Sequence, residues 1–167
     1  MVRLTTFETL TELLDQRVKA TPSAVAFVEK NSAGRWQKTR WNQFHEAVRD
    51  LAGQLWRAGL RPGDHVAVMM PNGVRWEMVQ HAVYRIGGIV VGLDRNDPAD
   101  RLADLFSRFK AKALILDDRL LLDRMQIANR YCPNCIDARG HYGCSKGNCY
   151  RRSPVPHSKR MLACHDA

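Results

Sequence analysis

The chain has 167 residues, of which 45% are hydrophobic and 26% charged, and its formal net charge is +9. This length supports one domain with a hydrophobic core and is too short for two ordinary domains. The sequence has no run of about 18 apolar residues and no apolar N-terminal leader, so it predicts neither a membrane span nor a secretory signal. The first 131 residues lack cysteine, which favours a cytoplasmic protein over one built on disulfides.

The composition changes near residue 128. Residues 1–128 contain 36 Leu, Ile, Val and Phe, whereas residues 129–167 contain three. The first value supports a core, and the second is typical of disordered chain. Residues 120–167 also hold 8 Lys and Arg against 3 Asp and Glu. We interpret this excess as solvated charge on a disordered end, in preference to a surface for nucleic acid or an anionic membrane.

The N-terminal region is predicted to form a helix and a β-hairpin. Thr9 and Glu12 have the spacing of a capping box, and Pro22 ends the helix that they begin. Residues 24–28 and 35–41 are predicted strands on either side of a turn. The helix is expected to bury its apolar stripe, which consists of Phe7, Leu10, Leu14 and Val18.

A second amphipathic helix is predicted after the hairpin. Asn42 is its expected N-cap, and Gly59 stands where a C-terminal glycine belongs. Its apolar residues recur at helical spacing and are Phe44, Val48, Leu51 and Leu55.

From residue 61 onward, strands and helices alternate after a turn with the sequence Arg-Pro-Gly-Asp. Predicted buried strands span 65–70, 89–93 and 113–116, and predicted helices span 74–86 and 98–109, the second capped by Asp97 ahead of Pro98. Apolar strands joined by helices are typical of a parallel sheet. We therefore predict an α/β fold, a partial doubly wound parallel sheet with flanking helices and an N-terminal hairpin, followed by an irregular tail.

These βαβ units raise the question of nucleotide binding, but the phosphate-binding motifs are absent. The first parallel strand is followed by PNGVRW, which matches neither G-x-G-x-x-G nor G-x-x-x-x-G-K-[ST]. Gly87 and Gly88 precede a strand, so we interpret them as a helix stop. The other polar and aromatic candidates are assigned to ordinary surface, turn or packing roles: His45, His65, His81, Asp94, Asp97, Trp36, Trp41, Trp56 and Trp76.

Three segments nevertheless resemble the opening of the AMP-forming adenylating ligases, and acyl-CoA synthetases most of all. They are LRPGDHVAVMMPN, YRIGGIVVGLDRNDP and RFKAKALIL, and the resemblance covers about residues 8–122. It implies an enzyme that activates a carboxylic acid with ATP and magnesium to an acyl-adenylate and then transfers the acyl group to coenzyme A. The family's lysine-ended Ser/Thr/Gly-rich loop, aromatic-Thr-Glu segment, ribose-binding aspartate and C-terminal lysine have no counterpart here. No catalytic or cofactor-binding residue is therefore assigned.

The cysteines gather after residue 131. Cys132, Cys135, Cys144 and Cys149 have a spacing that zinc can use. The eight residues between the two pairs, IDARGHYG, offer little to pack around a metal. The resemblance to an adenylating enzyme also continues to about residue 128 and then changes abruptly to Cys, Arg, His, Ser and Pro. We therefore favour a tail that is translated out of frame over a zinc module or an unstructured natural extension. The expected division is an N-terminal fragment of an AMP-dependent synthetase/ligase domain at 1–128 and a disordered Cys/Arg-rich tail at 129–167.

Three functions stay open. The favoured one is an N-terminal fragment of an acyl-CoA synthetase that is inactive alone and holds no cofactor itself, while ATP, magnesium, coenzyme A and a carboxylic acid substrate belong to full-length relatives. The second is a small zinc protein that contacts nucleic acid, and the third is a regulatory fragment that docks on a full-length relative. We also expect self-association through apolar surface that the rest of such an enzyme would cover.

Overall fold

The structure is a computed structural model that describes residues 8–116, 135–137 and 142–143. Its helices are α1 (Leu10–Ala20), α2 (Trp41–Arg57), α3 (Val74–Arg85) and α4 (Ala99–Phe109). Its strands are β1 (Val25–Lys30), β2 (Trp36–Arg40), β3 (His65–Met69), β4 (Ile89–Gly92), β5 (Ala113–Leu116), β6 (Cys135–Asp137) and β7 (Tyr142–Gly143). No helix of the described part is long and apolar enough to cross a bilayer.

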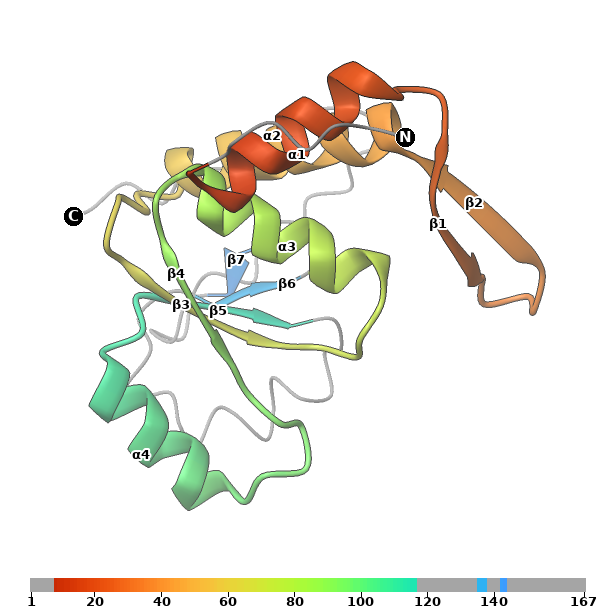
Figure 1. The fold of residues 1–167 in the computed structure, drawn as a ribbon. Helices are drawn as coiled ribbons and strands as arrows, with labels where there is room; N and C mark the ends of the chain where they lie inside the picture. Colours follow the sequence, from red (N-terminus) through yellow and green to blue (C-terminus); the bar gives the residue numbers. More distant parts are fainter. Residues whose placement is uncertain (1–7, 117–134, 138–141, 144–167) are drawn as a thin grey trace.

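The main sheet has the strand order β4-β3-β5-β6-β7, and β3 pairs in parallel with both β4 and β5. Helices α1, α2 and α3 lie on one face of this sheet and α4 lies on the other (Figure 1). The chain therefore places β4 on one side of the central strand β3 and β5 on the other. This is the doubly wound arrangement that the apolar strands and intervening helices predicted. Strands β1 and β2 form the separate antiparallel hairpin that was also predicted.

Two short strands lie beyond residue 128, where the sequence predicts no regular element. Strand β6 pairs in parallel with β5, and β7 pairs antiparallel with β6. Segments of three and two residues are too short to produce a recognisable hydrophobic period. The rest of the range 129–167 lies outside the described residues.

Local signals explain most element boundaries. Thr9 caps α1 by accepting a hydrogen bond from the Glu12 backbone N–H at 3.1 Å. The expected cap at Asn42 is wrong, because α2 already begins at Trp41, and the Gln43 side chain accepts instead from the backbone N–H of Arg40 at 2.9 Å. In the same way Pro98, and not Asp97, occupies the N-cap position of α4. Caps depend on where the chain enters the helix, which sequence spacing leaves uncertain by a residue or two.

Glycines end two helices and shape one turn as predicted. Gly59, after α2, has a φ of 87°, and Gly87, after α3, has a φ of 73°. Gly63 has a φ of 83°, and the Asp64 backbone N–H donates to the Arg61 carbonyl at 3.1 Å. A positive φ at the third residue of a hydrogen-bonded turn is the mark of type II, so this turn sets the entry into β3.

Two hydrophobic clusters sandwich the sheet. Alternate residues of β3 point to opposite faces, so Val66 and Val68 pack under α2 and α3, whereas Ala67 and Met69 pack against α4. On the α4 side, Phe106 fills the centre of the smaller cluster and is 1% exposed. The larger cluster includes the predicted stripe of α2, of which Phe44, Val48 and Leu55 are fully buried.

Several apolar residues are more exposed to solvent than the sequence predicts. Strand β4, expected to be buried, lies at the edge of the described sheet, and its Ile89 is 45% exposed. Leu10 and Phe109, expected on inward helix faces, are exposed, as are Trp36 and Trp56. An apolar run signals a strand but not its place in the sheet, which depends on the order in which strands pair.

Candidate functional site

The carboxyl ends of the parallel strands form the first candidate site. Ligands of doubly wound folds bind where the connections of neighbouring strands leave toward opposite faces. Here α3 follows β3 on one face and α4 follows β4 on the other (Figure 1). The chain runs from β3 to its neighbour β4 through α3 and then crosses through α4 to β5 on the other side of β3. The switch point therefore lies between the carboxyl ends of β3 and β5, at Met69 and Leu116.

The acidic residues at this edge serve the loop itself. One carboxylate oxygen of Asp94, Oδ1, accepts from the Asn96 backbone N–H at 2.8 Å and from its side-chain amide at 3.1 Å. Asp97 pairs with Arg101 at 3.4 Å on the first turn of α4. The predicted turn role is thus confirmed for Asp94. At Asp97 an ion pair replaces the predicted cap.

The N-terminus of α3 also lies at this edge and already faces an anionic group. A helix N-terminus attracts anions because its first backbone N–H groups have no partner within the helix. The Glu29 carboxylate of β1 approaches it, with Oε2 3.4 Å from the Val74 backbone nitrogen. This contact attaches the hairpin to α3. It also places the Glu29 carboxylate at the helix N-terminus, where a phosphate would otherwise bind.

A charged cluster joins the three helices above the sheet. Arg85 of α3 donates to both carboxylate oxygens of Asp15 on α1, and its shortest contact, from Nη2 to Oδ1, is 2.8 Å. His45 of α2 lies 2.8 Å from the same carboxylate through Nε2. His45, predicted to be an ordinary boundary histidine, is therefore part of an ion-pair network. Partners that lie 30 and 70 positions apart leave no signal in a single sequence.

His65 and His81, the other two histidines among the described residues, have other surroundings. His81 packs edge-on against Phe44 with ring centroids 5.6 Å apart, and its buried Nδ1 has no hydrogen-bond partner. Burial lowers the pKa of His81 below its usual value of 6.5, and the nearby Glu77 carboxylate opposes this shift only in part. His65 begins β3 and lies beside the Phe109 ring. The geometry gives neither residue a catalytic partner among the described side chains.

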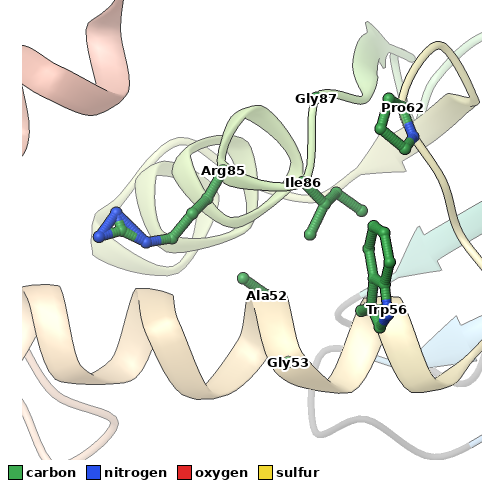
Figure 2. A pocket seen from close by; sticks show the side chains of 7 residues that line it. All are labelled: Ala52, Gly53, Trp56, Pro62, Arg85, Ile86 and Gly87. Carbon is green, nitrogen blue, oxygen red and sulfur yellow. The ribbon is translucent and has the colours of Figure 1, made fainter.

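An open pocket lies at the opposite, amino end of the sheet. It has a volume of about 460 Å³ and is walled by Trp56 from α2 and by Pro62 and Ile86 from the loops that precede β3 and β4 (Figure 2). Ala52, Gly53, Arg85 and Gly87 complete the lining. The sequence predicts only a packing role for Trp56 and gives no sign of this pocket, because the pocket is lined by segments about 30 residues apart.

The predicted zinc ligands cannot be placed together. Cys132, Cys144 and Cys149 lie outside the described residues, and Cys135 lies in β6. Among the described side chains, no three His, Cys, Asp or Glu gather closely enough to hold a metal ion. The described residues therefore form no binding site for the magnesium that the resemblance implies for full-length relatives.

Comparison with known proteins decides the family. The pattern of the AMP-binding enzyme family matches residues 14–154, which is well over half of the chain. The chain belongs to the AMP-binding enzyme family. The match confirms the resemblance of the three segments, and it continues past residue 128.

Individual members of the AMP-binding family support this assignment. The chain is 34% identical over 112 residues to YngI of Bacillus subtilis (strain 168), whose name places it with the acyl-CoA synthetases. That alignment covers 66% of this chain and 20% of YngI. A substituted octahydroindenyl-propanoyl:CoA ligase of Rhodococcus jostii (strain RHA1) is 33% identical over 81 residues, which cover 48% of this chain and 16% of the ligase. The chain thus spans a fifth or less of these relatives.

A solved structure of this family shares the fold. The N-terminal domain of FACL13 from Mycobacterium tuberculosis superimposes with a TM-score of 0.70 at 20% sequence identity. The match covers 80% of this chain and 35% of that domain. The match supports the mixed α/β architecture with its parallel strands β4-β3-β5. A shared fold does not by itself establish a shared reaction.

Proposed function

We propose that these residues form the opening part of the N-terminal domain of an adenylate-forming acyl-CoA synthetase. The observation that carries the proposal is the family match over residues 14–154, together with the identity to two acyl-CoA ligases. The complete enzyme would activate a carboxylic acid, in fatty acid metabolism, with ATP and magnesium, and would then form a thioester with coenzyme A. The first 131 residues lack cysteine, which supports a cytoplasmic location for this chemistry.

Within that enzyme, the described residues would act as a scaffold. At the carboxyl edge of β3 and β4, Asp94 stabilises its own loop. The N-terminus of α3 is already in contact with the Glu29 carboxylate, so it does not offer free N–H groups to a phosphate. Adenylation develops negative charge on the phosphates, and catalysis requires donors or cations aimed at it. Because the described side chains offer no such group, we propose that the 167 residues do not catalyse adenylation by themselves.

The first experiment measures acid-dependent exchange of pyrophosphate into ATP. We expect the purified 167-residue protein to show no exchange above a protein-free blank with carboxylic acids from acetate to palmitate. The Rhodococcus ligase with its own acid serves as the positive control. Exchange that depends on both the acid and this protein would contradict the proposal.

The scaffold role itself is tested in a chimera. The segment of the Rhodococcus ligase that aligns with this chain is replaced by the matching residues of this chain. We expect the chimera to keep its thioester-forming activity within about tenfold in kcat/KM, since a scaffold affects the reacting groups only indirectly. A matched chimera with Gly88→Val should lose activity, because a Cβ at Gly88 would lie 2.8 Å from Val83 Cγ1 in the core. A folded first chimera without activity would refute the scaffold role.

The division of the chain at residue 128 and the out-of-frame tail form a separate proposal, because the family match that carries the main proposal extends to residue 154 and is not expected of an out-of-frame tail. Resequencing the gene tests them directly: a one-base shift near codon 128 should open a long frame that encodes a Ser/Thr/Gly-rich loop. The zinc alternative has no support among the comparisons. Elemental analysis of protein purified under reducing conditions should give well under one zinc per chain, and one tight zinc that Cys132→Ser removes would reverse this choice.

A further inference from the structure

The pocket at the amino end of the sheet has fixed walls. The Arg61 guanidinium stacks on the Trp56 ring at 4.3 Å from its centroid. Arg61 Nη1 also donates to the carbonyls of Trp56 and Leu60, each at 2.8 Å. On the far wall, the Asp15 carboxylate holds the Arg85 guanidinium, which points away from Trp56 (Figure 2). The side chains that line the cavity are thus held in place before any ligand arrives.

The floor and walls between these arginines are apolar. Ala52 and Ile86 expose their side chains to the cavity, and Pro62 closes it above the Trp56 ring (Figure 2). Gly53 keeps one side open, because it carries no side chain where α2 borders the pocket. Trp56 is 46% exposed, although an indole gains free energy when its apolar surface is buried. The pocket therefore suits one bulky apolar group.

The rim is basic. Arg57 folds back along α2, so that a Cβ at Gly53 would lie 3.5 Å from its Nη1. Arg49 precedes Gly53 by four residues and so lies on the same side of α2. Arg61 makes no ion pair within the described part of the chain, because its neighbour Asp64 directs its carboxylate to Lys112 and to the Arg61 backbone N–H. Three exposed arginines therefore border an apolar cavity.

The position and shape of the pocket indicate the kind of occupant. It lies at the amino ends of β3 and β4, opposite the carboxyl edge at which doubly wound enzymes bind their substrates. Small-molecule sites enclose most of their ligand, whereas this cavity is open to solvent on one side. A side chain presented by another protein fits an open pocket with a basic rim better than a free metabolite does.

We propose that this pocket docks a partner protein through a bulky apolar side chain set in an acidic segment. The apolar side chain enters between Trp56 and Ile86, and carboxylates on either side of it pair with Arg49 and Arg61. This docking is separate from the proposed adenylation chemistry, so either can fail without the other.

The test uses the full chain and fluorescence anisotropy of labelled peptides. The probe is a peptide of about twelve residues with one central Phe among Asp and Glu, a length typical of segments that dock in grooves. Two matched peptides replace the Phe by Ser or every acid by Lys. We expect binding of the first peptide alone, and weaker binding as salt rises, because the rim charges are exposed.

Variants of the pocket then locate the binding site. Trp56→Ala and Gly53→Leu, which respectively remove a wall and fill the cavity, should each weaken binding about tenfold or more. The control is Trp36→Ala on the hairpin, since Trp36 is also exposed and also stacks with a cation, Lys30, at 5.2 Å. Trp36→Ala should leave the affinity unchanged. Circular dichroism checks that each variant keeps the fold.

Three results would overturn the proposal. The first is no saturable binding of the acidic Phe peptide, and the second is equal binding by the Gly53→Leu variant. The third is displacement of the peptide by octanoate with a similar affinity, which would make the pocket a site for small acids. A dimer that Gly53→Leu converts to monomer would instead identify a second copy of this chain as the occupant.

Discussion

At the scale of single residues, His81 is a titratable side chain that is partly shielded from water. Its ring packs on Phe44 and Tyr84, and its Nδ1 is buried without a partner. Burial disfavours the charged imidazolium, so the pKa of His81 in the folded protein lies below 6.5. The folded state therefore binds fewer protons at this site than the unfolded state does.

This difference predicts a pH dependence of stability. As the pH falls through 6.5, the unfolded chain takes up a proton at His81 before the folded chain does, and the free energy of unfolding decreases. His81→Phe removes the proton site and keeps an aromatic ring against Phe44. Urea unfolding between about pH 7.5 and about pH 5.5 should show a smaller loss of stability in the variant. Equal losses in both proteins would show that His81 is not responsible.

At the scale of elements, the ion pairs that link helices matter more than those within one helix. Asp15 and Arg85 join α1 to α3 through a bidentate contact, and their side chains are 35% and 22% exposed. Asp104 and Arg108 pair at 2.9 Å within α4, at 61% and 69% exposure. Partial burial reduces solvent screening of the first pair, and its rigid fork geometry reduces the entropy lost when it forms.

A pair of double-mutant cycles measures this contrast. Alanine substitutions at Asp15 and Arg85, singly and together, should give a coupling free energy of about 1 kcal/mol in urea unfolding. The matched cycle at Asp104 and Arg108 should give about 0.3–0.5 kcal/mol or less, as exposed pairs one helical turn apart do. A coupling at Asp15 and Arg85 no larger than in α4 would mean that the interhelical pair adds little to the docking of α1.

At the scale of the whole molecule, apolar surface stays uncovered. Ile89 lies on the edge strand β4, and Val25, Val28 and Phe109 are exposed elsewhere. In relatives of which the aligned part of this chain covers a fifth or less, further chain is present that would cover such surface. Each 400 Å² of apolar area left in water forgoes roughly 10 kcal/mol, which is comparable to the stability of an ordinary domain.

We therefore expect the 167-residue protein to self-associate or to be poorly soluble. Sedimentation velocity should show an average mass that rises with concentration. Ile89→Lys should reduce this rise, because a charge on an edge strand opposes strand pairing between molecules. Ser107→Lys, at an exposed polar position of α4, adds the same charge without removing apolar surface or touching an edge strand, so it is the control and should have a smaller effect. A monomer that unfolds cooperatively above roughly 55 °C would contradict this expectation.

The sequence by itself determined the local elements and the family. The 4-3-4 spacing of Phe44, Val48, Leu51 and Leu55 reports burial within one helix, and the Pro-Gly pair at 62–63 suffices for a type II turn. Such signals arise from neighbouring residues, so a single chain displays them. The order of strands and helices and the three quoted segments were then enough to indicate an AMP-binding enzyme.

Only the tertiary structure decided which segments meet. Strand β4 is a short apolar run, as β3 is, yet pairing with β3 alone leaves β4 at the edge of the described sheet. Asp15, His45 and Arg85 converge because three helices pack on one face of the sheet. Trp56 and Ile86 line one pocket because α2 packs against α3. These contacts join residues far apart in sequence, so they depend on strand order and helix packing, which hydrophobic periodicity does not encode.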